Sequence, residues 1–362
     1  MNSKNKKVTM HDVAQRAGVS YQTVSRVLNN SCNVSPATRE KIEKAIADLK
    51  YVPNLLAQQL SKKERRVIGL VNVSRNLQAP SDVVDRLRHY ALKKDYELLI
   101  TLIDNMEKSS IDECISRLKA QLITRILINV PLESNVAAQI MTDNDDCNLV
   151  FMDVDPFSPV LNVSFNPFDG TMASIHHLNE LGHRKVALIP GPDKAISSML
   201  RMKSWSEGLK NHSMESVACV GGDWTAKSGY DAMMSILHQT RDFTAVLVAN
   251  DQMALGAISA LNICSLRVPE DISVVGYDNT NDSAFFHPPL TTVSLDRDLQ
   301  CKIAIDKLIS ENESEVSAVL PTSLILRQSC AKAGKKGFDT TQMAASLREM
   351  ALRLEEMGKE SA

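Results

Sequence analysis

Apolar and polar residues follow three successive patterns along this chain. Up to about residue 53, apolar residues recur three to four positions apart in short stretches, which is typical of small amphipathic helices. From residue 67 to about 330, short apolar runs rich in Val, Ile and Leu alternate with amphipathic helical stretches. Beyond residue 339, apolar residues return at spacings of four and three. The pattern therefore predicts a helical head, an α/β body and a helical tail.

The head is predicted to contain three helices with distinct start signals. Thr9 and Asp12 form a T-x-x-D capping signal for the first helix, and Gly18 permits the tight turn that ends it. The second helix is predicted to start at Ser20, and the third is PATREKIEKAIADLK, in which Ser35 and the following proline supply the start. The first two helices and their turn, AQRAGVSYQTVSR, form the pattern of a helix-turn-helix.

The body is predicted to form two lobes, each built on a parallel sheet with helices on both faces. The expected strands are residues 67–73, 96–103, 125–130 and 148–154 in a first series, and 185–191, 245–250 and 272–279 in a second. Near-continuous apolar strands are typical of parallel sheets that are buried on both faces. Doubly wound lobes bind ligands beyond the carboxyl ends of their strands, so we expect a ligand site in the crevice between the lobes.

The tail is predicted to be a short helix after a flexible linker, AKAGKKGFD, at residues 331–339. Its apolar residues form a heptad seam: Met343, Leu347, Met350, Leu354 and Met357. Packing of this helix on its own body is the alternative. The linker favours association with other subunits, because a tethered helix has no fixed partner in its own subunit.

Composition places the chain among ordinary globular proteins, with 44% hydrophobic and 23% charged residues. No apolar run approaches the ~20 residues that cross a bilayer, and the N-terminus lacks the apolar region of a signal peptide, so we expect a cytoplasmic protein with no membrane partner. The seven cysteines form no C-x-x-C pair and no zinc-like cluster. We therefore expect reduced, buried thiols, no metal and no cofactor.

The charge distribution is strongly asymmetric. Residues 1–66 contain 13 Lys and Arg against 5 Asp and Glu, a net charge of +8, whereas the rest of the chain carries −10. A solvated charged face is one explanation. A basic segment of this size also meets the electrostatic requirement for binding a nucleic acid.

Three segments in the same order and at similar spacing, VTMHDVAQRAGVSYQTVSRVLN, YVPNLLAQQL and VLVANDQMALGA with DISVVGYDN, resemble the lactose repressor family of bacterial transcription regulators. The resemblance covers nearly the whole chain, including the tail. It implies a DNA-binding headpiece (residues 1–53), a hinge helix and linker (54–65), a two-lobed sugar-binding and dimerisation core (66–333) and a tetramerisation helix (334–362). The expected lobes are residues 66–165 with 294–323, and 166–293 with 324–333.

The second helix of the head is then the recognition helix, whose N-terminal residues read base edges in the major groove of double-stranded operator DNA. Tyr21, Gln22 and Arg26 are the predicted base-reading residues, and Arg pairs well with guanine. Simple exposure of polar residues is the alternative. The predicted phosphate contacts are Thr9, Ser20, Thr23, Ser25 and Asn29.

The segment LLAQQL is too short to be a stable isolated helix, so we expect it to become ordered on DNA. The family resemblance implies that two such hinge helices lie side by side in the minor groove. In that arrangement Leu60 inserts at the central base step and Ala57 lies at the close contact between the helices.

The resemblance also places the effector site. Its predicted polar residues are Asn129, Asp153, Ser197, Arg201, Trp224, Asn250 and Asp278, and its predicted apolar residues are Leu77, Ala79 and Phe165. Arg201, Asn250 and Asp278 would bind neighbouring hydroxyls of a sugar, and Trp224 would stack on its ring. Each has a structural alternative: Asn250 caps a helix, Asp278 supports a turn and Trp224 belongs to the core.

Three positions depart from the lactose-responsive type of the family, where a serine, a glutamine and a phenylalanine stand. This chain has Val73, Leu295 and Arg297 there. The changes leave the predicted hydroxyl-binding residues intact and alter the side that faces the second sugar or aglycone. A galactoside inducer is expected; a family repressor that responds to a different sugar is the alternative.

Two other classes of protein are disfavoured. An enzyme could use Asp153-x-Asp155 as a metal site or the pair His176 and His177, but adjacent helical residues point about 100° apart and the chain has no common catalytic motif. A sugar-binding module without DNA binding does not explain the basic head. The sequence therefore predicts a homodimeric repressor that assembles to a tetramer and is not an enzyme.

Overall fold

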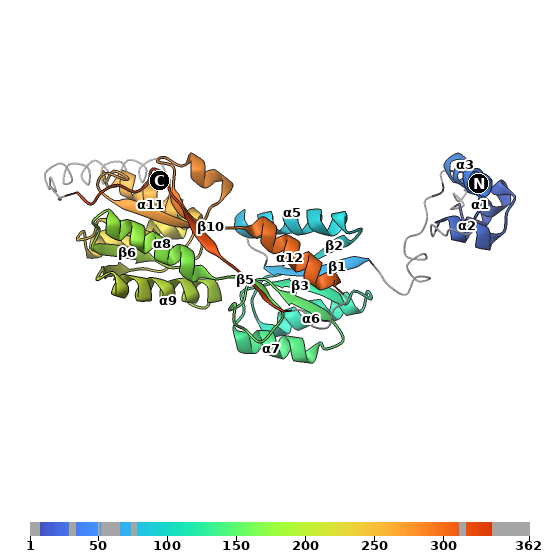
Figure 1. The fold of residues 1–362 in the computed structure, drawn as a ribbon, viewed down its shortest axis with the longest axis horizontal. Helices are drawn as coiled ribbons and strands as arrows, with labels where there is room; N and C mark the ends of the chain where they lie inside the picture. Colours follow the sequence, from blue (N-terminus) through green and yellow to red (C-terminus); the bar gives the residue numbers. More distant parts are fainter. Residues whose placement is uncertain are drawn as a thin grey trace, which may run out of the picture. The chain divides into compact units, whose positions relative to one another are not determined.

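A computed structural model of the chain describes residues 8–28, 34–49, 51, 66–73, 78–310 and 316–334, and divides it into two units at Arg66 (Figure 1). Several predictions lie outside these residues: Asn29, Ala57, Leu60, Leu77 and the five residues of the tail seam. The backbone of Ala79 lies in a described helix, but the structure does not describe its side chain. These residues keep the status of predictions.

The head is a three-helix unit: α1 (Met10–Ala17), α2 (Tyr21–Leu28) and α3 (Pro36–Asp48). The predicted capping box is confirmed, because the Thr9 hydroxyl accepts from the Asp12 N–H and the Asp12 carboxylate accepts from the Thr9 N–H. Gly18 has φ 67°, in the left-handed region that glycine adopts without strain. The small apolar core consists of Val13, Ala14, Val24, Val27, Ile42 and Ala45.

Lobe 1 contains a four-stranded parallel sheet in the order β2-β1-β3-β4. Its first series of elements is β1 (Val67–Val73), α5 (Gln78–Lys93), β2 (Glu97–Ile103), α6 (Lys108–Lys119), β3 (Arg125–Asn129), α7 (Ser134–Asp143) and β4 (Asn148–Phe151). One apolar cluster joins the sheet to α5 and another joins it to α6 and α7. β1 is buried on both faces, as the sequence predicts.

Lobe 2 contains a six-stranded sheet in the order β12-β10-β9-β8-β6-β7, in which β12 is antiparallel to β10 and the other pairs are parallel. Its elements are α8 (Pro167–Glu180), β6 (Lys185–Ile189), α9 (Ile196–Asn211), β7 (Glu215–Cys219), α10 (Ala226–Gln239), β8 (Ala245–Val248), α11 (Asp251–Ile263), β9 (Ser273–Asp278), the 3-10 helix η1 (Asn281–Phe285), β10 (Thr291–Leu295) and β12 (Thr322–Ile325). The predicted helix-turn-helix head and two-lobed α/β body are confirmed.

The chain passes three times between the lobes. β5 (Val163–Phe165) pairs with β11 (Ala318–Leu320), and α12 (Arg297–Ile309) packs against α5 in lobe 1 (Figure 1). The second and third passages follow β10 and precede β12, close to the approximate lobe limits expected at 294 and 324. Ser294 and Leu295 still belong to β10, because Ser294 pairs with Asp278 of β9, and β12 already begins at Thr322.

Two expectations about burial are wrong. The strand at 96–103 is not buried on both faces: β2 lies at the edge of its sheet, and Ile100 and Leu102 are 42% and 58% exposed. Cys219 is exposed because β7 is the edge strand of the other sheet, whereas Cys114, Cys264 and Cys301 are buried as expected. Among the described residues, no helix is both long and apolar enough to cross a bilayer.

Candidate ligand cavity and DNA-binding face

A cavity of about 190 Å³ lies between the two lobes, where strands of both sheets end. Eight of the residues predicted for the effector site line it: Asn129, Asp153 and Phe165 from lobe 1, and Ser197, Arg201, Trp224, Asn250 and Asp278 from lobe 2. Val73, Leu295 and Arg297, which depart from the family pattern, line it as well. The structure therefore brings together side chains that are up to about two hundred positions apart in sequence.

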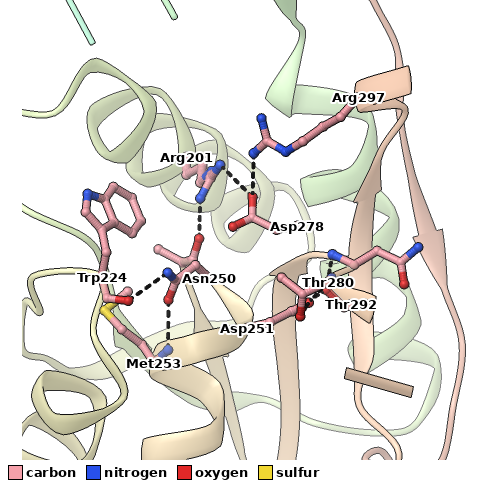
Figure 2. A network of polar contacts seen from close by, with 11 residues as sticks. Arg201, Trp224, Asn250, Asp251, Met253, Asp278, Thr280, Thr292 and Arg297 are labelled. Carbon is pink, nitrogen blue, oxygen red and sulfur yellow. Dashed lines mark hydrogen bonds and ion pairs between the residues drawn. The ribbon is translucent and has the colours of Figure 1, made fainter. Parts of the chain in front are cut away.

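A cluster of three charged side chains lies inside the cavity (Figure 2). Asp278, at the end of β9, is 3.5 Å from Arg201 and 3.3 Å from Arg297 through the same carboxylate oxygen. Arg201 also donates to the main-chain oxygen of Ala249, and its guanidinium lies 3.7 Å from the centre of the Tyr277 ring. Burial and these contacts fix Arg201 in one orientation, so its donors and the Asp278 carboxylate are positioned before a ligand arrives.

Asn250 connects this cluster to Trp224. Its Oδ1 accepts from the N–H of Met253 (2.8 Å) and so caps α11, as the structural alternative predicts. Its Nδ2 donates to the main-chain oxygen of Trp224 (2.9 Å; Figure 2). The second N–H of Asn250 Nδ2 makes no hydrogen bond within the described residues, so a ligand hydroxyl can still use it.

Three of the seven described non-glycine residues with positive φ lie in or beside the cavity wall. Trp224, Asp278 and Asn279 have φ of 79°, 111° and 52°, a region that costs residues with side chains about 1–3 kcal/mol each. The Trp224 ring packs on Gly191, where an added Cβ would lie 2.3 Å from the indole. Only glycine leaves room for the ring in this position.

Asp153 is the second carboxyl in the wall of the cavity, besides Asp278. Burial raises the pKa of its carboxyl, while nearby Arg297 and Arg201 lower it and Asp278 raises it further. Among the described residues, its side chain has no hydrogen-bond partner. A buried carboxyl of this kind can donate to a ligand when protonated or accept from it when ionised.

Sequence reasoning did not identify several polar residues of the cavity. Asn72 is 3% exposed, and its Oδ1 accepts from Asn129 Nδ2 (2.9 Å), which orients Asn129 at the end of β3. Gln300 lines the wall from the first turns of α12. The sequence signal that could have identified them is a polar residue inside an apolar pattern. Asn72 interrupts the apolar run VIGLVNV, and Gln300 lies on the buried face of its helix.

Asp251 lies directly behind the cavity and is fully buried at the start of α11. Its carboxylate accepts from the Thr280 N–H (2.8 Å) and from the Thr292 hydroxyl (2.6 Å; Figure 2). Burial, together with the nearby Asp278, raises the pKa of Asp251 to about 7 although these hydrogen bonds lower it. The carboxyl ties α11 to the strained turn after β9.

The residues considered for enzyme chemistry do not form a site. Asp155 accepts from the Phe157 N–H (2.9 Å) in a local turn, and His176 is exposed and paired with Glu180. No group of three or more His, Cys, Asp and Glu side chains within the described parts of the chain is arranged to hold a metal ion.

On the head, the three predicted base-reading residues, Tyr21, Gln22 and Arg26, are all exposed on α2. The Tyr21 ring lies 4.8 Å from that of His11. Of the predicted phosphate-binding hydroxyls, that of Thr9 donates to Asp12, and those of Ser20 and Thr23 are hydrogen-bonded to each other (2.8 Å). Ser25 is half-buried on the same helix.

A helix-turn-helix head joined to a two-lobed body with a polar cavity defines a ligand-responsive regulator that binds DNA. The comparisons agree: residues 9–54 match the family model of bacterial regulatory proteins, lacI family, and residues 175–330 match the periplasmic binding protein-like domain. The chain belongs to the lacI family of bacterial regulatory proteins.

Individual relatives support this assignment. The chain is 38% identical to the lactose operon repressor of Escherichia coli (strain K12), over 96% of this chain and 97% of that one. It is 39% identical to the lactose operon repressor of Klebsiella pneumoniae, over 89% and 92%. A crystal structure of the lac repressor dimer bound to operator and the anti-inducer ONPF matches with a TM-score of 0.86 and 38% identity, over 90% of this chain and 100% of that one.

Proposed function

We propose that this protein represses a sugar-utilisation operon of the lactose type, and that a galactoside binding between its lobes releases it from operator DNA. The observation that carries the proposal is the cluster of Arg201, Asp278 and Trp224 in one cavity. Charged donors and acceptors suit neighbouring sugar hydroxyls, and the indole suits the C–H face of the ring. Asn129, Asp153, Ser197 and Asn250 supply further polar contacts.

The DNA-binding part of the proposal rests on the head. Tyr21, Gln22 and Arg26 are exposed together on the second helix of a helix-turn-helix in a segment with a net charge of +8. A homodimer would place two such helices on a pseudo-palindrome with half-sites about one helical turn apart. Ala57 and Leu60 would act in the minor groove between them.

The tail seam supports assembly of two dimers into a tetramer. Four helices that share the apolar stripe running from Met343 to Met357 would form an antiparallel bundle. A tetramer can hold two operators and loop the DNA between them, because the second operator then binds at high effective concentration. Action on chromosomal DNA also implies a cytoplasmic, nucleoid-associated protein.

The test is operator binding by fluorescence anisotropy, with and without a galactoside. The sugar should weaken operator binding, and by linkage operator DNA should weaken sugar binding by the same factor. Asp278→Ala should bind operator and fail to respond. If Asp278→Ala still releases DNA at the wild-type sugar concentration, the cavity is not the effector site. Chromatography of the recovered sugar distinguishes a regulator, which returns it unchanged, from an enzyme.

A further inference from the structure

The lobe-1 wall of the cavity contains polar side chains whose bonding capacity is not used. Arg297 is the first residue of α12, Gln300 follows one turn later, and Ser164 lies in β5. All three line the cavity. We call these three residues the α12 subsite.

Arg297 has donors to spare. Its side chain is 23% exposed, and its Nη2 donates to Asp278 across 3.3 Å. Within the described residues this is the one hydrogen bond that its guanidinium makes, although the group carries five N–H donors. A largely buried guanidinium with unused donors is suited to a ligand that offers several acceptors in one plane, as a phosphate or carboxylate does.

The cavity wall holds two guanidinium groups, Arg201 and Arg297, and two carboxyls, Asp153 and Asp278. Asp278 is shared between Arg201 and Arg297, so one carboxylate faces two guanidinium groups. The two carboxylates beside Arg297 in sequence do not line the cavity and are used elsewhere: Asp296 accepts from the Leu299 N–H (2.9 Å), and Asp298 pairs with Arg86 (3.0 Å). Of the described acidic residues, Asp153 is then the other one in the wall, and burial raises the pKa of its carboxyl. When Asp153 is protonated, the wall carries a net positive charge, which favours an anion beside Arg297.

Two further features of the cavity wall are the N-terminus of α9, which adds positive potential, and buried polar atoms without partners. α9 begins in the cavity wall, and its N-cap residue Ala195 has no side chain to accept from the first-turn N–H groups, so the positive end of the helix is open there. Gln300 donates to the main-chain oxygens of Met152 and Val163, but its Oε1 has no partner among the described residues. The buried Ser164 hydroxyl likewise has none within that part of the chain. Arg297 and the Ser164 hydroxyl can donate to an anion, whereas Gln300 Oε1 needs a donor such as a ligand hydroxyl. An apolar aglycone would leave all three groups unsatisfied, at a cost in affinity.

We propose that the ligand of this cavity is a glycoside that carries an anionic group, a phosphate or a carboxylate, and that Arg297 in the α12 subsite binds this group. The inference rests on the proposed function, because it takes Arg201, Asp278 and Trp224 as the site of the sugar ring. Arg297 then determines which glycosides the protein recognises. A ligand anion would also replace part of the Arg297–Asp278 contact, which frees Asp278 for ring hydroxyls.

The test is calorimetric titration of the full-length protein with probes that differ in the charge of the aglycone: methyl galactoside, galactosyl glycerol phosphate, carboxymethyl galactoside and inorganic phosphate alone. We expect one anionic sugar to bind at least tenfold more tightly than the neutral one, and the two anionic arms distinguish a phosphate from a carboxylate. Arg297→Gln should lower this ratio to less than about threefold, and Arg297→Lys should restore part of it. Thermal unfolding of both variants checks that they are folded.

Equal or weaker binding of both anionic sugars by the wild type overturns the inference, and so does a preference that survives in Arg297→Gln. Binding of inorganic phosphate alone at the affinity of the sugar phosphate also contradicts it, because the residues that bind the sugar ring would then contribute nothing to affinity. The proposed function is judged separately. If the neutral galactoside binds and releases operator while Asp278→Ala does not respond, the function stands and the anion preference alone fails. If no galactoside binds, both fail.

Discussion

The side-chain amide of Asn250 holds the main-chain oxygen of Trp224 at 2.9 Å while its oxygen caps α11. One side chain thus fixes both the start of a lobe-2 helix and the turn that presents the indole to the cavity. Asn250→Ala removes both interactions. We expect it to lower the free energy of unfolding by about 1 kcal/mol through the lost cap and to weaken galactoside binding at least tenfold.

Asn250→Ser is the matched control, because serine caps helices about as well as asparagine but cannot reach Trp224. It should keep most of the stability and lose the binding. Urea unfolding and calorimetry measure the two quantities. Equal loss of stability in both variants would show that the cap contributes nothing here.

Gly191→Ala should displace the Trp224 ring, because the added Cβ would lie 2.3 Å from the indole. We expect sugar affinity to fall at least tenfold while operator binding remains. Gly221→Ala is the control in the neighbouring loop, where the nearest atom to an added Cβ is 3.8 Å away. Tryptophan fluorescence and anisotropy follow the two effects, and normal sugar binding by Gly191→Ala would refute stacking on Trp224.

Stability should depend on pH through Asp251. Its pKa is raised to about 7 in the folded protein and is about 3.9 in the unfolded chain, so between these values the folded state binds the extra proton. Stability contributed by the protonated carboxyl is fully present below about pH 4 and is lost as the pH rises from there through about 7. The expected loss from this group between pH 5 and pH 8 is about 2–3 kcal/mol.

Asp251→Asn isolates that contribution, since an amide resembles the protonated carboxyl at all pH values. The difference in free energy of unfolding between wild type and variant, measured with urea at pH 5 and pH 8, removes the opposing effect of buried His183, whose pKa burial lowers. A difference that does not change with pH would show that Asp251 does not titrate in this range.

Arg26→Ala should weaken operator binding by about 1–3 kcal/mol and relax the preference at one base position. Arg16→Ala removes the same charge from the head at a position where the arginine pairs with Asp48 (3.2 Å), so it should affect binding much less and without a change in sequence preference. Selection from a randomised operator library measures both the relative affinity for operator and the preference at each base position. An unaltered preference in Arg26→Ala would exclude it as a base-reading residue.

Truncation after Ala333 should convert tetramers into dimers that still bind one operator and respond to sugar. The seam residues from Met343 to Met357 are removed, and the core stays intact. Light scattering at micromolar protein gives the mass of each form. A full-length protein that is already dimeric, with no change on truncation, would refute the bundle and leave the repressor proposal unaffected.

The sequence predicts elements best where local chemistry and burial agree. β1 occupies the expected residues 67–73, and the Thr9–Asp12 capping box forms as predicted, because both depend on neighbouring residues. The exposure of Leu102 depends on which strand lies at the sheet edge, and that is decided by strand order rather than by the strand itself. An apolar run in the sequence therefore does not show whether its strand lies at the edge of a sheet.

The same distinction applies to the cavity. The family resemblance, through motifs such as VAND and GYDN, places Asn250 and Asp278 in the effector site, and both line the cavity in the structure. Nothing local indicates that Arg297, on a helix packed in lobe 1, reaches Asp278 at the end of a strand in lobe 2. Contacts across the crossovers depend on two or more elements that are distant in sequence, so single-sequence patterns do not contain them.

β1 begins at Val67, directly after the residue where the head unit ends, and all seven of its residues are buried. It pairs with β2 on one side and β3 on the other, so it cannot slide lengthwise without turning its side chains to the wrong faces. The chain before Val67 is thus attached directly to an interior strand of lobe 1. Any tilt of that sheet would therefore move the point at which the chain enters it.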